Sequence, residues 1–180
     1  MKQPSKLFSN LRLLGLVLYG LVLSPYSYSQ EVVTGPFLIR DGIYYHQDTN
    51  ELVTGTMESF YRNGQLDMRA NFIGGVQDGL SEVFRENGQL QLRDNWRDGV
   101  KESLSEMFYE NGQLQIRSYY IDGLQDGLTE IFHENGQLEI RGNYTNGKPD
   151  GPFGNFDEDG NFIGTTTFRN GERVEENNNP

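Results

Sequence analysis

The sequence contains no cysteine, which excludes disulfide bonds, thiolate metal sites, thiol nucleophiles and a lipid-modified N-terminal cysteine. Histidine occurs only at His46 and His133, so most metal and acid–base sites would lack their usual residue. Only 35% of the 180 residues are hydrophobic, which is too few for a packed multilayer core. The aromatic share of 12% is nevertheless too high for a disordered chain, and 22 glycines favour short strands joined by tight turns.

The motifs of the common enzyme classes are also missing. The chain has no nucleophile elbow, zinc-protease helix, phosphate-binding loop or dinucleotide fingerprint. Its glutamates recur at equivalent places along the chain, whereas a glycosidase needs one pair of acids in a cleft. The sequence therefore predicts no catalytic residue and a protein that is not an enzyme.

Several aspartates stand beside glycine, a pattern also found in calcium loops. Calcium requires six to eight oxygen ligands, and each of these loops supplies only one or two acids. Turn chemistry explains aspartate before glycine without any ion. We therefore expect no cofactor and no metal site, with calcium as the alternative that these loops leave open. The aspartates are Asp78, Asp98, Asp122, Asp126 and Asp150.

The N-terminal residues have the order of a secretory signal. Lys2, Lys6 and Arg12 form a basic head, an unbroken apolar run of 11 residues covers 13–23, and small polar residues follow. A membrane span would need about 20 apolar residues, so a transmembrane anchor is the weaker interpretation. The sequence predicts cleavage near Ser29–Gln30 and a secreted, periplasmic or cell-envelope protein.

Acidic residues dominate the charge. The net charge is −11, and it becomes −14 without residues 1–29, because three of the 15 basic residues and none of the 26 acids lie there. A chain with this charge repels nucleic acid and anionic lipid. We therefore expect no nucleic-acid partner, and contact with a membrane only at its periphery.

The remaining chain repeats with a period of 24 residues, which indicates a stacked-repeat architecture. The motif Asn-Gly-Gln-Leu begins at residues 63, 87, 111 and 135. Aromatic, glycine, glutamate and arginine columns recur with the same period. The aromatic column is Phe72, Trp96, Tyr120, Tyr144 and Phe168; one glycine column is Gly55, Gly79, Gly127 and Gly151, with Ser103 in the missing place; the charged columns are Glu58, Glu82, Glu106 and Glu130, and Arg69, Arg93, Arg117 and Arg141.

Each unit is predicted to be a β-hairpin, because apolar and polar residues alternate on both sides of Asn-Gly. The Asp-Gly connections between units are expected to be longer loops. The register has two solutions. A two-residue turn at 87–88 pairs Glu82 with Arg93, whereas a three-residue turn pairs Phe84 with Leu90. The charge pairing slightly favours the first.

The predicted fold is all-β: an elongated antiparallel β-meander of stacked 24-residue hairpins. The domain organisation is a signal peptide at 1–29, a repeat domain at 30–174 and a disordered acidic, asparagine-rich tail at 175–180. Within the domain, residues 41–55 form a divergent opening half-repeat and full repeats run from about 56 to 172. Residues 151–173 are expected to form a polar cap.

The repeated unit, Phe-x-x-Asn-Gly-Gln-Leu followed by an aromatic residue and Asp-Gly or Asn-Gly, resembles the MORN repeat. It is most similar to the MORN-variant repeat of bacterial YwqK-type antitoxins. Residues 142–151 are the closest stretch, and the resemblance extends over about 41–172. It implies a scaffold that binds other molecules through the surface of its sheet.

We therefore expect a non-enzymatic, exported scaffold for protein–protein interaction. Its partner is unknown, and a toxin or an envelope protein would fit. The alternatives are an antitoxin-like neutraliser of a partner toxin, and peripheral binding to a lipid or glycan of the cell envelope. The candidate interaction surface consists of Phe72, Trp96, Tyr120, Tyr144, Arg69, Arg93, Arg117 and Arg141. His133 is expected to face solvent, because other copies have Tyr or Arg at its position.

Overall fold

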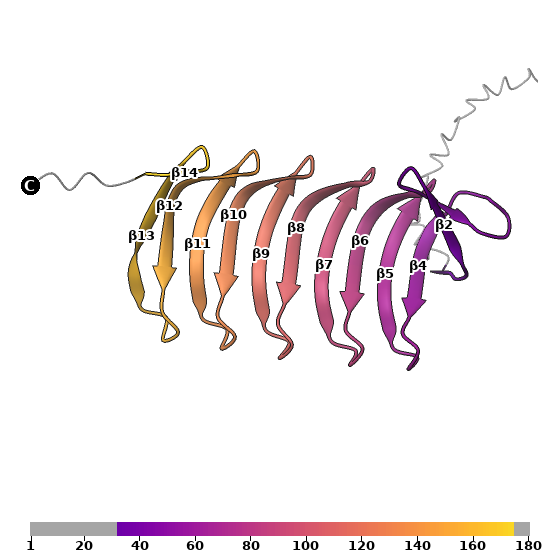
Figure 1. The fold of residues 1–180 in the computed structure, drawn as a ribbon, viewed down its shortest axis with the longest axis horizontal. Helices are drawn as coiled ribbons and strands as arrows, with labels where there is room; N and C mark the ends of the chain where they lie inside the picture. Colours follow the sequence, from indigo (N-terminus) through magenta and orange to yellow (C-terminus); the bar gives the residue numbers. More distant parts are fainter. Residues whose placement is uncertain (1–31, 175–180) are drawn as a thin grey trace, which may run out of the picture.

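The computed structural model describes residues 32–174, and every regular element in this range is a β-strand (Figure 1). No helix in these residues is long and apolar enough to cross a membrane. The proposed signal peptide and the tail at 175–180 lie outside the described residues. The strands are β1 (Val32–Val33), β2 (Phe37–Arg40), β3 (Ile43–His46), β4 (Gly55–Phe60), β5 (Leu66–Ile73), β6 (Val76–Phe84), β7 (Leu90–Arg97), β8 (Val100–Phe108), β9 (Leu114–Ile121), β10 (Leu124–Phe132), β11 (Leu138–Thr145), β12 (Lys148–Phe156), β13 (Phe162–Arg169) and β14 (Glu172–Arg173).

One long sheet contains β1 and then β4 to β14 in chain order, while β2 and β3 form a separate two-stranded sheet. All neighbouring strands of the long sheet are antiparallel except β1 and β4, which pair in parallel. Figure 1 shows the strands side by side in a single row. The elongated all-β meander predicted from the 24-residue period is confirmed.

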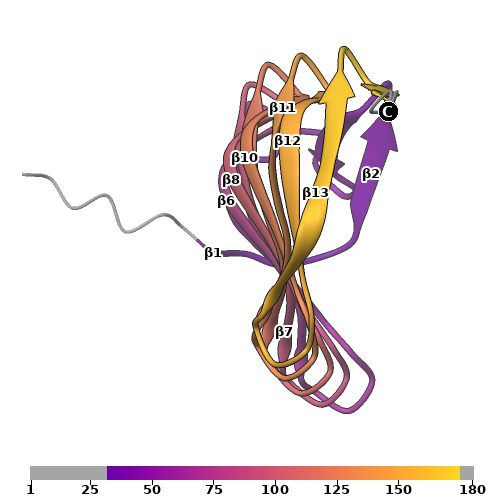
Figure 2. The same cartoon turned by 90° about the vertical axis from the view of Figure 1, so that its left-hand side faces the viewer.

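The β2–β3 hairpin lies against one face of the sheet at its N-terminal end. Figure 2 shows that the sheet curves and that this hairpin is on the concave side. Beneath it, Val53, Met57, Ala70 and Phe72 form a small buried core, with Tyr44 packed against it. This hairpin therefore gives the first unit a second layer.

The Asn-Gly turns differ from the two-residue turn that the charge pairing favours. Asn87 keeps a negative φ while Gly88 has φ 82°, and Arg85 N–H donates to Gln89 O at 2.8 Å. The loop is thus the three-residue one, with Phe84 opposite Leu90. The strand then bulges at Gln91, and this extra residue restores the pairing of Glu82 with Arg93. Both alternative pairings coexist because of the bulge.

The Asp-Gly connections are not the longer loops that the sequence suggested. Arg97 pairs directly with Val100, so Asp98 and Gly99 form a two-residue turn with φ values of 50° and 77°. Positive φ at both positions defines the type I′ turn of tight hairpins. The residues that were expected to lengthen the loop lie instead in the following strand, where three residues of β8 (102–104) oppose Asn95 alone.

Ser103 is in the middle of that wide bulge. It has φ 65°, and Gly79, Gly127 and Gly151 have positive φ at the equivalent positions of other units. Glycine adopts this conformation without cost, whereas a residue with a side chain is strained there. The glycine column therefore reflects the backbone conformation of the bulge.

The turns of successive hairpins are bonded to one another by a column of side-chain donors. Tyr61 Oη, Arg85 Nη2 and Tyr109 Oη each donate to the carbonyl of a phenylalanine 23 residues ahead, at 2.7 Å. His133 Nε2 lies 3.1 Å from the carbonyl of Phe156. The expectation that His133 faces solvent is wrong, because its side chain is only 19% exposed and bridges two units. Desolvation, together with the nearby Glu139 charge, raises the pKa of Tyr109, which favours the protonated donor form.

At the opposite end of the strands, an acid accepts a backbone N–H of the next turn in every unit from β6 onward, and Thr54 has this role in the first unit. Asp78 accepts from Asp98 N at 3.1 Å, Asp126 from Asn146 N at 3.0 Å, and Asp150 from Asn170 N at 3.1 Å. These three aspartates are among the residues that the sequence pattern suggested as calcium ligands. Their observed role is to fix the next turn, and residues 32–174 contain no cluster of three acidic or histidine side chains placed to hold a metal.

We predict that Ser103→Gly stabilises the protein by about 1 kcal/mol, because glycine relieves the strain of positive φ. Ser103 is exposed, so little packing is lost. Urea unfolding followed by circular dichroism measures the change. The control is Gly112→Val: φ is 83° there and an added Cβ would meet no atom within 4 Å, so the loss of about 1–3 kcal/mol isolates backbone strain. Unchanged stability in both variants would contradict the argument.

Candidate functional site

The two halves of the candidate surface lie on opposite faces of the sheet. Successive residues of a strand point to opposite sides, so Arg93 and Trp96 of β7 diverge. The aromatic column shares the concave face with the β2–β3 hairpin, where Tyr44 packs on Phe72. The arginine column lies on the other, convex face. The expectation of one surface formed by both columns is therefore wrong.

The convex face bears a ladder of alternating charges. Each glutamate is opposite an arginine on the neighbouring strands, from β4 to β11. Arg93 lies 3.1 Å from Glu82 and 3.6 Å from Glu106, and Arg117 lies 3.2 Å from Glu106 and 3.7 Å from Glu130. The Glu106 side chain is only 11% exposed. The arginines of this ladder form ion pairs with the glutamates of neighbouring strands, and these pairs stabilise the sheet.

The aromatic column changes character along the concave face. Phe72 is 1% exposed beneath the β2–β3 hairpin, so it cannot contact a partner. Its ring lies 4.6 Å from that of Tyr44. The next three, Trp96, Tyr120 and Tyr144, are partly exposed, and no second layer of described residues covers them (Figure 2). The candidate surface thus begins after the first unit.

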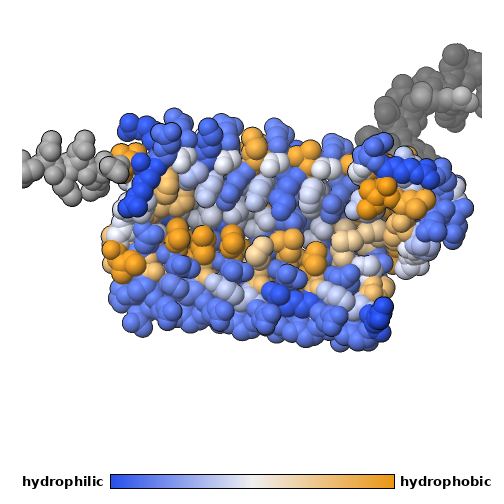
Figure 3. Space-filling view, viewed as in Figure 1, coloured by the Kyte–Doolittle hydropathy of each residue, from blue (hydrophilic) through white to orange (hydrophobic). Residues whose placement is uncertain are grey.

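Below the aromatic column, an aliphatic row crosses the same face. Its members are direct cross-strand neighbours, and Figure 3 shows an apolar band that runs along the sheet. The row consists of Val83, Leu92, Met107, Ile116, Ile131 and Ile140. Single exposed apolar residues are common on protein surfaces, but a continuous band on one face is typical of an interaction site.

Between these two rows lies a row of small polar residues that the sequence patterns did not reveal. Ser105 Oγ donates to Asp94 Oδ1 at 2.6 Å, and Lys101 Nζ lies 2.9 Å from the same oxygen. Gln125 Nε2 donates to Ser118 Oγ at 3.1 Å and to Thr129 Oγ1 at 2.6 Å. The polar atoms thus bond to one another, which lets them lie buried in a sheet without a second layer.

Lys101 joins the polar row to the aromatic column. Its ammonium group lies 5.8 Å from the ring centroid of Trp96 and 5.0 Å from that of Tyr120. Both distances are within the range of cation–π attraction. Trp96 Nε1 is buried and has no hydrogen-bond partner. The centre of the face thus combines a cation, two rings and an unpaired donor.

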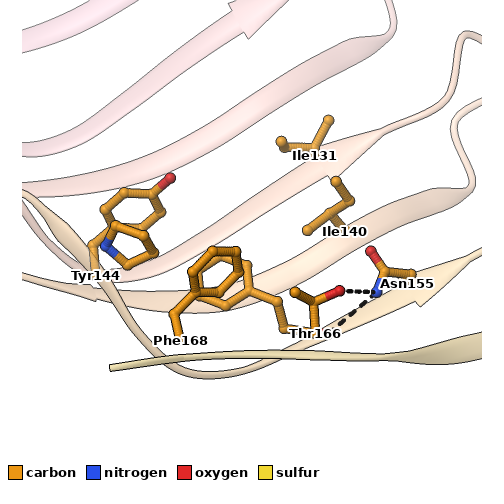
Figure 4. Close-up of a pocket in the computed structure, with 8 residues that line it drawn as sticks. Ile131, Ile140, Tyr144, Asn155, Thr166 and Phe168 are labelled. Atoms are coloured by element: carbon orange, nitrogen blue, oxygen red, sulfur yellow. Dashed lines mark hydrogen bonds between the residues drawn. The ribbon is translucent and has the colours of Figure 1, made fainter. Parts of the chain in front are cut away.

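The C-terminal half of the face is hollowed. A cavity of about 340 Å³ is lined by Ile131, Ile140, Tyr144, Pro149, Phe153, Asn155, Thr166 and Phe168. Figure 4 shows Tyr144 and Phe168 on one side of this hollow and Ile131 and Ile140 on the other. Phe153 stacks edge-on between Tyr144 and Phe168, at centroid distances of 5.8 and 5.0 Å. The cavity suits an apolar side chain of a partner.

Asp94 and Lys101 could not be found from the repeats because they do not belong to repeated columns. Ala70, Ser118 and Gly142 stand at the positions equivalent to Asp94. The sequence feature that could have indicated Asp94 is its charge, because the equivalent positions of the other units have small uncharged residues. Tyr44 was missed because it precedes the regular repeats.

We predict that Lys101→Met destabilises the protein by about 1–3 kcal/mol, because the Asp94 carboxylate loses its cation while 6% exposed. The matched control is Arg97→Met. Arg97 is 71% exposed and lies 3.6 Å from Glu102, so its loss should change stability by at most about 0.5 kcal/mol. Thermal unfolding at neutral pH compares the two. Equal effects would show that burial of Asp94 does not decide the result.

Three segments of the chain match a known family of repeats. The family described as MORN repeat variant matches residues 53–73, 101–122 and 125–146, which cover the β4–β5, β8–β9 and β10–β11 hairpins. No curated protein is similar enough to count as a match. MORN repeats form scaffolds, are not typically enzymatic, and typically mediate interactions with proteins or membranes. Three of the repeated hairpins are thus similar to the MORN repeat variant, and this similarity agrees with the 24-residue period of the sheet.

Proposed function

We propose that this protein is a non-enzymatic, exported scaffold that binds a partner polypeptide on its concave face. The partner would place an aromatic or aliphatic side chain against the exposed aromatic residues of the second and later units. The convex face would keep the sheet in register and make no contact with the partner.

The observation that carries this proposal is the β2–β3 hairpin, which acts as an internal example of a bound polypeptide. Tyr44 stacks on Phe72 at 4.6 Å, and Tyr44 N–H donates to Gly75 O at 2.9 Å. The hairpin thus uses the rings of Tyr44 and Phe37, which both pack on the buried cluster, and a backbone hydrogen bond at the turn. Within this cluster Phe72 is only 1% exposed.

The following units repeat the site on which this hairpin rests. Trp96, Tyr120 and Tyr144 occupy the position of Phe72 at intervals of 24 residues. Gly99, Gly123 and Gly147 likewise occupy the position of Gly75, with φ values of 77–78°. Because strands lie about 4.8 Å apart, equivalent sites of successive units are about 10 Å apart. An extended or hairpin polypeptide laid along the face could reach several of them.

Export is the second part of the proposal. Residues 13–23 form an apolar run after a basic head, which is the arrangement of a secretory signal. An exported partner, or one in the cell envelope, would then meet the concave face. N-terminal sequencing of the protein from the native envelope or medium tests this part: a chain that begins near Gln30 agrees with export, and one that retains residues 1–29 contradicts it.

We predict that Tyr120→Ala combined with Tyr144→Ala lowers capture of the partner at least tenfold. The experiment immobilises the full chain and measures binding of proteins from an extract of the source cells. Two truncated rings would remove two of the repeated contacts, each worth about 1 kcal/mol or more.

Tyr119→Ala is the matched control, because Tyr119 is the same residue type, 40% exposed, next in sequence and on the convex face. A protein that binds the wild type and Tyr119→Ala equally, but not the double variant, is bound on the concave face. Thermal unfolding confirms that all three chains are folded. If Tyr119→Ala abolishes the same binding, or the double variant retains it, the concave face is not the site.

A further inference from the structure

Among residues 32–174, no strand covers most of the outer edge of the last long strand, β13. β12 pairs with β13 along its length, from Gly151 opposite Phe168 to Phe156 opposite Phe162. On the other side of β13, β14 pairs only with Phe168 and Arg169. Val174 N–H also donates to Thr167 O at 2.8 Å. Within the described residues, the outer edge of 162–166 has no strand beside it.

This edge lacks the features that normally prevent strands from pairing between molecules. Residues 162–168 (Phe-Ile-Gly-Thr-Thr-Thr-Phe) contain no charge and no proline. Charged side chains and proline are the usual protection of a sheet edge, and uncharged β-branched residues favour pairing. Phe162 is 60% and Ile163 is 65% exposed. The last long strand of the cap expected for residues 151–173 is therefore uncharged, with two exposed apolar side chains.

We propose that two copies of this protein join through β13, in antiparallel register, to form a closed two-fold dimer. Neutral strands of the same sequence meet without like-charge repulsion, although each chain has a net charge of −11. The dimer extends both sheets into one. It does not rest on the proposed function, because it uses the strand edge and not the concave face.

The free backbone groups determine the register. Peptide groups along a strand edge alternate between outward and inward directions. Thr167 O points outward and is already bonded to Val174, so the next outward residue is Thr165. The alternation is no longer regular at Ile163, which is the extra residue of a bulge opposite Asn155 and Phe156. Pairing about Thr165 sets the Thr165 residues of the two copies opposite one another and leaves Thr167 O bonded in its own chain. Gly164 lacks a side chain, which permits close approach of the second backbone.

The opposite end of the sheet makes a filament unfavourable. There β1 pairs in parallel with β4 at Thr56 and Met57 and occupies the middle of that edge. Glu58 adds a charge beside the paired segment. Head-to-tail growth would need both ends open, whereas two open β13 edges close on one another.

The test is the mass of the full chain in solution, measured by sedimentation at micromolar concentration. The wild type should sediment at about twice 20.6 kDa. Ile163→Lys with Thr165→Lys should sediment as a monomer, because edge lysines block strand pairing. Ile39→Lys is the control: Ile39 is 61% exposed in the β2–β3 hairpin, and the dimer should persist. Circular dichroism verifies that each variant is folded.

Cysteine variants test the register directly, since the natural chain has no cysteine. Thr165→Cys should form a covalent dimer on oxidation, and Ile39→Cys should not. A monomeric wild type, larger assemblies, or a dimer that survives both lysines would overturn the proposal. A full chain that is monomeric, but dimerises when residues 175–180 are removed, would also overturn it and would assign the edge to the chain's own tail.

Discussion

Most of the long sheet has no second layer packed on either face within the described residues, and the rest of the structure depends on this constraint. Each hairpin must obtain its stability from the hairpins on either side. The few fully buried apolar residues cluster mainly where the β2–β3 hairpin supplies a second layer. Elsewhere, hydrogen bonds and ion pairs between units replace a conventional core. This arrangement matches the low hydrophobic content of 35%.

The recurring polar residues are explained by what they bond in the next unit. Tyr61 and Tyr109 reach a backbone carbonyl 23 residues ahead, and Asp78 and Asp126 accept an N–H 20 residues ahead. A position that needs only a donor tolerates Tyr, Arg or His. Variation within a column therefore marks a shared hydrogen-bonding role and does not mark exposure to solvent.

The 24-residue period predicted the architecture, because self-similarity fixes which strands are neighbours. It also predicted the pairing of Glu82 with Arg93. The period could not predict the bulge at Gln91, since one inserted residue satisfies two alternative registers at once. It could not place the β2–β3 hairpin either, because Tyr44 meets Phe72 through a contact outside the repeats. Successive side chains of a strand point to opposite faces, so residues three positions apart lie on different faces. The candidate surface combined Arg93 with Trp96, which are three positions apart in β7.

The two faces differ in how completely their side chains are satisfied. On the convex face, Arg93 and Arg117 each lie between two glutamates, so little binding capacity remains there. On the concave face, the polar row is internally bonded, but the rings above it and the aliphatic row below it are only partly covered. A partner that covers these rings would supply the second layer that the β2–β3 hairpin supplies to the first unit. The same physical deficit, a sheet without a second layer, thus accounts for both the repeated bonds that stabilise the protein and the face left for binding.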